Sequence, residues 1–238
     1  MTPAALTALL DATWPPAAIR RDGPWDIREG QGGGKRVSAA TLAGGWTEAD
    51  IATAEAAQRG LGQVPLFMIR PGEAELDAAL ERRGYALVDP VVLYSAPVAE
   101  LATERPPPIS TFCLWPLLQI MRDLWAEGGI GPDRIAVMER AGAPKCAILG
   151  RVNDRAAGVA FLAGQGDAAM LHALHVIPEQ RRQGIAVKMM RAAAFWAQDH
   201  AISDLYVAVT EANAGARSLY ASLGMAIVEK YHYRIGTA

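Results

Sequence analysis

Three short β-prone runs in the middle of the chain are followed by a helical pattern of apolar positions. The runs Lys145–Val152, 157–163 and 169–176 are divided by Asn153-Asp154 and by residues 164–167, which have the composition of hairpin turns. This arrangement predicts an antiparallel meander. After it, Ile185, Met189, Ala192, Ala193 and Trp196 recur at helical spacing and predict an amphipathic helix over 184–199.

The rest of the second half also divides into short elements. Pro132 introduces one of two short helices before the meander, and Gly224 suits the left-handed cap of a late helix. The predicted helices are 115–126, 133–140 and 214–223, with a strand at 204–209 and a last pair of strands within 225–235.

Prolines divide the chain into two plausible domains. Pro97, Pro106, Pro107 and Pro108 lie close together and predict an extended connector. The expected organisation is a first domain at 1–96, a linker at 97–110 and a second domain at 111–238.

The two halves overlay when the sequence is shifted by 224 − 84 = 140 residues, so that Gly84 lies on Gly224. The identities are few and mostly alanine, but the order helix, strand, helix, glycine turn, strand is kept. This order indicates a duplication whose first copy has drifted. The alternative is a chance overlay of two α/β segments. The same shift places Gly44 on Gly184, 66–69 on 206–209, 76–83 on 216–223 and 86–88 on 226–228.

Composition narrows the class of protein. The 238 residues are 51% hydrophobic and carry a net charge of −2, which argues against nucleic acid as the main partner. The only cysteines, Cys113 and Cys146, have no metal or redox spacing, and we expect them to be reduced. No signal peptide or apolar run of about 20 residues is present, so we expect a cytoplasmic protein.

The segment 176–186 is the strongest sign of chemistry. It predicts a strand that passes through a basic loop, Arg181-Arg182-Gln183-Gly184, into a helix. Unpaired N–H groups at a helix N-terminus carry partial positive charge, and a glycine lets a phosphate approach the main chain. A bare R-x-x-G-x-A pattern is weak by itself, but its place between a meander and an amphipathic helix strengthens it.

At this point the chain resembles the GNAT superfamily of N-acetyltransferases. The acetyl-CoA motif of that family, Q/R-x-x-G-x-G/A after the fourth strand, reads Arg181, Gly184 and Ala186 here. A second family landmark, an Asn after the fifth strand and a Tyr on the next helix, reads Asn213 and Tyr220. The resemblance covers 111–235 well and the first half only in outline. It implies an α/β (α+β) fold, with a mixed, mostly antiparallel twisted sheet flanked by helices, duplicated here.

The resemblance also implies where acetyl-CoA binds. In the family, the fourth and fifth strands splay apart, and the pantetheine arm pairs with the backbone that the splay frees. Leu174, His175 and Val176 would then face the pantetheine. The diphosphate would meet the backbone of Arg181, Arg182, Gln183, Gly184, Ile185 and Ala186, and Asn213 would either contact the cofactor or cap the helix beside it.

Two residues are candidates for catalysis. Tyr220 matches the family's general acid, which protonates the departing thiolate, although a helical Tyr can also be a packing residue. The family's usual glutamate base is replaced by Met170. By alternation along a strand, Met170, His172, Leu174 and Val176 share one face and His175 points the other way, which makes His172 the candidate base. A buried, hydrogen-bonded histidine is the commoner alternative.

Other positions narrow the function. Relatives that acetylate protein N-termini carry a Glu where this chain has Ala208, so that activity is disfavoured. The first half lacks the cofactor motif, and we expect Gly32-Gly33-Gly34-Lys35-Arg36 to form a hairpin turn and not a phosphate loop. The sequence predicts transfer of an acetyl group from acetyl-CoA to a primary amine of a small molecule or peptide, without a metal. A non-catalytic acyl-CoA-binding module and a protein lysine acetyltransferase are the alternatives.

Overall fold

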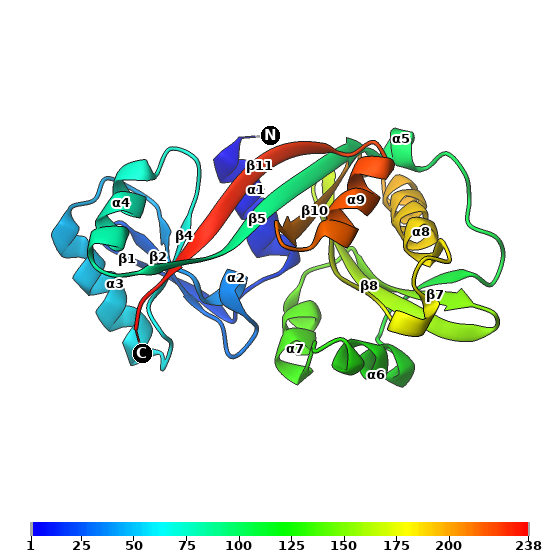
Figure 1. The fold of residues 1–238 in the computed structure, drawn as a ribbon, viewed down its shortest axis with the longest axis horizontal. Coiled ribbons are helices and arrows are strands. Elements are labelled where there is room, and N and C mark those ends of the chain that lie inside the picture. Colours follow the sequence, from blue (N-terminus) through cyan, green and yellow to red (C-terminus); the bar gives the residue numbers. More distant parts are fainter. Residues whose placement is uncertain (1, 238) are drawn as a thin grey trace.

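The strands and helices expected in the second half are largely present in the computed structural model, which describes residues 2–237. Two lobes are joined by long strands that cross the middle of the molecule (Figure 1). The first lobe begins with α1 (Pro3–Thr13), β1 (Ala18–Asp22), β2 (Trp25–Glu29), α2 (Lys35–Ser38) and β3 (Thr41–Leu42). It continues with α3 (Glu48–Gly60), β4 (Leu66–Ile69), α4 (Ala74–Arg82) and β5 (Ala86–Pro97).

The second lobe contains the meander and the amphipathic helix that the sequence predicts. Its first elements are α5 (Val98–Leu101), β6 (Thr111–Leu114), α6 (Gln119–Glu127), α7 (Pro132–Arg140), β7 (Lys145–Val152), β8 (Arg155–Gln165) and β9 (Ala168–Val176). A 3-10 turn, η1 (Pro178–Gln180), then precedes α8 (Ile185–Asp199), β10 (Asp204–Thr210), α9 (Ala214–Ser222) and β11 (Ala226–Ile235).

One eight-stranded sheet runs through both lobes in the order β4-β11-β5-β10-β9-β8-β7-β6, and β1, β2 and β3 form a separate small sheet. Every neighbouring pair in the large sheet is antiparallel except β9 and β10. A mixed, mostly antiparallel sheet flanked by helices is therefore confirmed.

The two lobes exchange strands at the centre of the sheet. β5 leaves the first lobe and pairs with β10, while β11 leaves the second lobe and pairs with β4. The pairing register is the same in both exchanges. Tyr206 of β10 pairs with Ser95 of β5. The residues displaced from these two by 140 positions, Leu66 of β4 and Ile235 of β11, also pair with each other. Figure 1 shows the two long strands crossing side by side.

The parallel pair β9 and β10 opens part-way along its length. The two strands are paired from Ala168 and Asp204 as far as Leu171 and Val207. Beyond that point β9 pairs only with β8, and β10 only with β5. The opening therefore exposes one edge of each strand near the middle of the molecule.

A bulge in β9 changes the predicted side-chain directions. Val159 pairs with His175 and Phe161 with His172, so two residues, Ala173 and Leu174, lie opposite one. Ala173 has a positive φ of 51°, and its carbonyl accepts a hydrogen bond from Trp125 Nε1 at 2.9 Å. Such an extra residue breaks the alternation of a strand.

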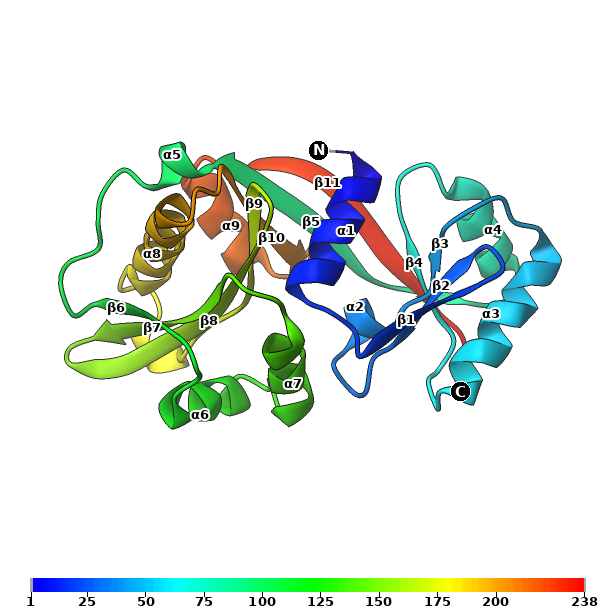
Figure 2. The same ribbon diagram turned by 180° about the vertical axis from the view of Figure 1, so that it is seen from behind.

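The expectation that His172 and Leu174 share a face is therefore wrong. Leu174 and Val176 pack against the apolar cluster that includes α8, whereas the ring of His172 lies 5.1 Å from that of Trp14 on the opposite side of the sheet. His175 lies beside Gly128, where a Cβ would come within 2.6 Å of its Nδ1. α1 covers β8 and β9 on the His172 side (Figure 2).

Three local expectations are also corrected. The end of the chain forms one continuous strand, β11, with register shifts, in place of a pair of strands. Gly32–Arg36 is not a hairpin turn, because it leads into α2 and packs on the second lobe: a Cβ on Gly33 would lie 2.6 Å from Val137 Cγ2. The predicted extended connector contains α5, whose Val98 and Leu101 are buried.

Two apolar clusters cover the faces of the second lobe's sheet. The first joins β7–β10 to α8, and the second joins β8 to α6 and α7. Over residues 2–237, no helix has both the length and the apolar character needed to cross a membrane. The described residues also contain no group of three or more His, Cys, Asp or Glu arranged to hold a metal ion.

Candidate functional site

The loop between β9 and α8 presents free backbone donors. The N–H of Arg181 bonds to the carbonyl of Pro178, and the Nε of its side chain donates to the carbonyl of Val176 at 3.0 Å. By contrast, the N–H groups from Arg182 to Ala186 form no hydrogen bond with any described residue. Five successive amides are therefore available for a ligand.

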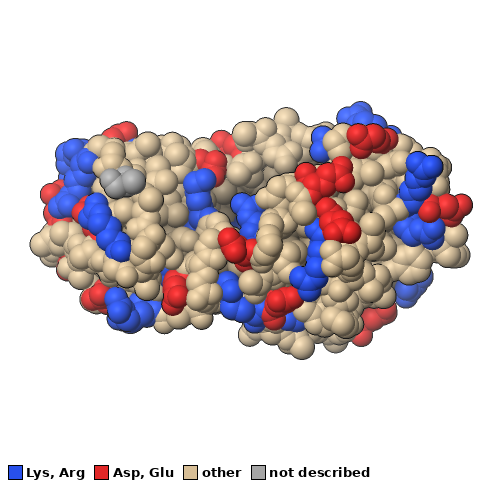
Figure 3. Space-filling model, turned by 90° about the horizontal axis from the view of Figure 1, so that it is seen from below, with Lys and Arg blue, Asp and Glu red and all other residues tan. Residues whose placement is uncertain are grey.

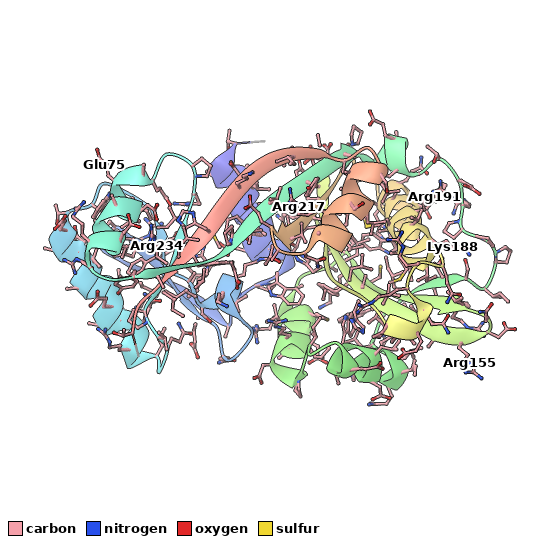
Figure 4. The ribbon with its side chains drawn as sticks, in the orientation of Figure 1. Glu75, Arg155, Lys188, Arg191, Arg217 and Arg234 are labelled. Atoms are coloured by element: carbon pink, nitrogen blue, oxygen red, sulfur yellow. The ribbon has the colours of Figure 1, made fainter. Side chains whose placement is uncertain are left out.

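Backbone geometry keeps the loop open. Arg182 and Gly184 have left-handed φ angles of 62° and 78°, and a Cβ placed on Gly184 would meet no atom within 4 Å. α8 has 15 residues and no acidic residue in its first turn, so the partial positive charge at its N-terminus is not offset there. Lys188 and Arg191 follow on the same helix (Figure 4). This end of α8 suits a phosphate or diphosphate.

The predicted cofactor residues lie together at the opening between β9 and β10. Leu174, His175 and Val176 form the free end of β9 and lead into the loop, and all three are half-buried. His175 Nε2 is buried without a hydrogen-bond partner among the described residues, and burial lowers the pKa of His175. A chain with amide groups could pair along the edge of β9 here as an added strand does.

Tyr220 lies on α9, buried against the second lobe's main apolar cluster, with its ring 5.6 Å from that of Tyr94 on β5. Its hydroxyl forms no hydrogen bond within the described part of the chain. Burial raises the pKa of Tyr220 to about 12, so the hydroxyl keeps its proton at neutral pH. The side chain is therefore a neutral donor in an apolar setting.

Asn213 caps α9. Its Oδ1 accepts a hydrogen bond from the N–H of Ala216 at 3.0 Å, which is the N-cap contact expected from an Asn at this position. The capping alternative for Asn213 is thus present in the structure. The amide nitrogen of the side chain remains free of described partners.

His172 is enclosed by polar contacts from the first lobe. Nη1 of Arg36 donates to its Nδ1 at 3.0 Å, and its Nε2 lies 2.9 Å from the hydroxyl of Thr13. Since an arginine only donates, the ring proton belongs on Nε2. Burial, followed by the charge of Arg36, lowers the pKa of His172 well below 6.5.

These contacts conflict with the interpretation of His172 as the general base. The lone pair that would take a proton already accepts the hydrogen bond from Arg36. The neutral ring instead fixes the direction of the arginine side chain.

A cavity of about 270 Å³ lies beside this pair, between the two lobes and next to the opening of β9 and β10. Both basic and acidic side chains border the hollow at the middle of the molecule (Figure 3). Its polar lining residues include Lys35, Arg36, Asp89, Arg134, His172, Thr210, Tyr231 and Tyr233.

The sequence suggested that the first half completes the acceptor pocket or packs beside the second half, but it did not identify the first-lobe residues that reach this cavity. Arg36 follows the glycine run that was interpreted only as a turn, and Tyr231 and Tyr233 alternate on β11. The available signal was the basic pair Lys35-Arg36 after three glycines. Its importance depends on packing against α7, which local sequence does not reveal.

The two cysteines lie on the neighbouring strands β6 and β7. A hydrogen bond from Cys146 lowers the pKa of Cys113, while the same contact and burial raise the pKa of Cys146. Both thiols are free and stand apart from the cavity.

Comparison with known proteins agrees with this geometry. The sequence model described as the Acetyltransferase (GNAT) family matches residues 114–225. A Bacillus subtilis protein described as the uncharacterized N-acetyltransferase YobR is 25% identical, over 95% of this chain and 96% of its own. Together they support a place for the chain in the GNAT acetyltransferase family.

Solved structures share the fold at low identity. A GCN5-related N-acetyltransferase from Kribbella flavida has a TM-score of 0.72 at 16% identity, covering 99% of this chain and 95% of that one. A protein of unknown function from Staphylococcus epidermidis has a TM-score of 0.72 at 11% identity, covering 94% and 95%. A tandem GNAT protein from the clavulanic acid biosynthesis pathway, solved without AcCoA, has a TM-score of 0.63 at 13% identity, covering 98% and 88%.

Proposed function

We propose that the protein is an acetyl-CoA-dependent N-acetyltransferase that acts on the primary amine of a small molecule or peptide. One observation carries the proposal: the free amides from Arg182 to Ala186 lie at the N-terminus of α8, beside the free edge of β9. Coenzyme A carries a diphosphate followed by an arm that contains amide groups. The loop amides can bind the diphosphate, and the free edge of β9 can pair with the arm.

The chain's residues fit acetyl-CoA. The open space above Gly184 admits a phosphate, and the backbone of Leu174 and Val176 offers a strand edge. When bound, acetyl-CoA supplies an activated acetyl thioester. The amides of the loop would hold its diphosphate, and Asn213 would keep the start of α9 in place through its cap.

Tyr220 is proposed as the proton donor. Its raised pKa, to about 12, keeps the hydroxyl protonated, and no described residue competes for that proton. A general acid at the leaving sulfur contributes on the order of 10²- to 10⁴-fold to a rate. The attack is proposed to be direct, because Cys113 and Cys146 lie outside the cavity.

His172 is proposed to position Arg36 and not to remove a proton. An amine of ordinary pKa, about 10.4, is only one part in about 10³ neutral at pH 7. Deprotonation therefore requires either a water-mediated path or another group at the cavity. Asp89 is the only carboxylate on the described wall of the cavity.

The first lobe is proposed to be a drifted copy of the second. The repeated register, in which Tyr206 faces Ser95 and Leu66 faces Ile235, supports a duplication with exchanged last strands. The boundaries 1–96, 97–110 and 111–238 remain our division of the sequence, although β5 from the first part lies in the sheet of the second.

Thiol release tests the proposal. The purified chain is incubated with acetyl-CoA and a panel of small amines, short peptides and polyamines, and free coenzyme A is measured with a thiol reagent. Acetylated product and stoichiometric thiol release are expected with at least one amine. Binding of acetyl-CoA without amine-dependent release would instead support the non-catalytic module, and release only with lysine-containing proteins would support a protein lysine acetyltransferase.

A further inference from the structure

The central cavity is electropositive. Its described wall carries the cations Lys35, Arg36 and Arg134 against a single carboxylate, Asp89, and the His172 ring is neutral. Lys35 and Asp89 pair at 2.8 Å, and each side chain is nearly half exposed. The excess positive charge comes from Arg36 and Arg134, so the cavity favours a ligand with a negative group.

Arg36 has no acidic partner among the described residues. Nη1 is committed to His172, whereas Nε is buried and has no partner among residues 2–237. The guanidinium also interacts with the hydroxyls of Tyr231 and Tyr233, so no carboxylate among these partners balances its charge. Nε and Nη2 form the side edge of the planar group, which binds a carboxylate through two parallel hydrogen bonds.

Two tyrosine hydroxyls lie next to Arg36. The hydroxyl of Tyr231 is buried without a described hydrogen-bond partner, and it lies beside the Arg36 guanidinium together with the hydroxyl of Tyr233. Buried donors without acceptors are rare in folded proteins because they are costly. The guanidinium can donate to the Tyr231 hydroxyl, but the positive charge of this cluster is left without an anion, which favours a negatively charged ligand oxygen here.

The size of the cavity limits the ligand. A volume of about 270 Å³ corresponds to roughly nine water-sized groups, since water occupies about 30 Å³ in the liquid. This is the scale of a single amino acid. Asp89 provides an acidic counterpart for a positively charged group on the same wall.

We infer that the acceptor is a small aminocarboxylate, whose carboxylate binds at the cluster of Arg36 and the Tyr231 hydroxyl while its amino group lies toward Asp89. The inference rests on the proposed function and specifies its substrate class. It assigns carboxylate recognition to the first lobe, whose glycine loop packs closely against α7.

Matched amine pairs test the inference. kcat/KM for thiol release is measured with L-leucine and 3-methylbutylamine, L-methionine and 3-(methylthio)propylamine, and L-lysine and cadaverine, with phosphoethanolamine as the phosphate-bearing amine. The wild type is compared with Arg36→Met, with Tyr231→Phe, and with Arg155→Met as a control, because Arg155 is exposed at the far end of the second lobe (Figure 4).

We expect the carboxylate-bearing member of at least one pair to be preferred tenfold or more by the wild type and by Arg155→Met. The preference should vanish in Arg36→Met and weaken in Tyr231→Phe. Equal rates within every pair, or a phosphate-bearing amine preferred to all carboxylates, would overturn the inference. An unchanged preference in a folded Arg36→Met variant would overturn it as well, and would mean that Arg36 and Tyr231 satisfy each other.

A binding measurement separates this inference from the proposed function. If no amine produces thiol release, the proposed function fails, and the same pairs are then titrated calorimetrically into the wild type and Arg36→Met. Binding that requires both the carboxylate and Arg36 would sustain the cavity assignment. Absence of such binding would overturn it.

Discussion

Arg36 and His172 are 136 positions apart in sequence and are joined by a hydrogen bond of 3.0 Å from Nη1 of the arginine to Nδ1 of the histidine. The bond ties α2 of the first lobe to β9, the strand that opens beside the cavity. It also requires a neutral imidazole, because a protonated ring has no lone pair to accept it.

The neutral state of His172 should appear in the pH dependence of stability. Its pKa in the folded chain is well below 6.5, so the unfolded chain takes up the proton first as the pH falls. The stabilisation is complete above pH 6.5 and decreases below it. We expect the unfolding free energy of the wild type to fall more steeply than that of His172→Gln, by up to about 1.4 kcal/mol per pH unit.

Urea unfolding at several values between pH 4.5 and 8 measures this slope. His200→Gln is the matched control, because His200 is exposed on the surface. Its curve should follow that of the wild type. Curves for the wild type and His172→Gln that stay parallel below pH 6.5 would show that the ring is not held neutral.

Tyr220→Phe should lower turnover at least tenfold and leave acetyl-CoA affinity nearly unchanged, because only the proton donor is removed. Stability should change little, since the hydroxyl has no hydrogen-bond partner in the described chain. With its pKa raised to about 12, Tyr220 should cause no loss of activity up to about pH 11 in the wild type.

Tyr85→Phe is the control for this substitution. Tyr85 lies in the first lobe and donates to Glu55 at 2.8 Å, so its loss should cost about 1 kcal/mol of stability without changing turnover. Turnover of Tyr220→Phe equal to that of the wild type would rule out the acid role.

Gly184→Glu should abolish detectable acetyl-CoA binding. A glutamate here places bulk and negative charge in the open space beside five free amides. The left-handed φ of 78° also adds strain, which costs roughly 1–2 kcal/mol for a residue with a Cβ.

Gly84→Glu separates the strain from the charge. Gly84 has a φ of 81° and an equally open Cβ position, but it lies at the end of α4 in the first lobe. Both variants should lose similar stability in thermal unfolding, and calorimetry should find weakened coenzyme binding only in Gly184→Glu. Wild-type affinity in a folded Gly184→Glu protein would contradict the placement of the diphosphate.

Removal of residues 1–96 should prevent folding of the remainder. The truncation deletes β5, including the buried Val92, Leu93 and Tyr94, and leaves the long edges of β10 and β11 unpaired at the middle of the sheet. Unpaired central strands expose backbone groups and aggregate. Expression of 97–238 should give insoluble protein, and a soluble monomer with native circular dichroism would show that the second lobe folds alone.

Local sequence was sufficient for most elements of the second lobe. The helical spacing of Ile185, Met189 and Trp196 predicted α8, and the turn residues between the β-prone runs predicted the meander. These signals depend on neighbours within a few positions, which is why they are readable without tertiary structure. The same holds for the glycine loop before α8 and for the Asn213 cap.

The tertiary structure alone decided what faces the cavity. The bulge at Ala173 of β9 is stabilised by the hydrogen bond from Trp125 of α6. It places Leu174 on the opposite face from His172, whereas the regular alternation of a strand would place both on one face. The exchange of β5 and β11 and the contact of Arg36 with His172 depend on pairing between distant segments. These contacts form because they lower the free energy of the whole packed molecule. They therefore cannot be predicted from any short stretch of neighbouring residues.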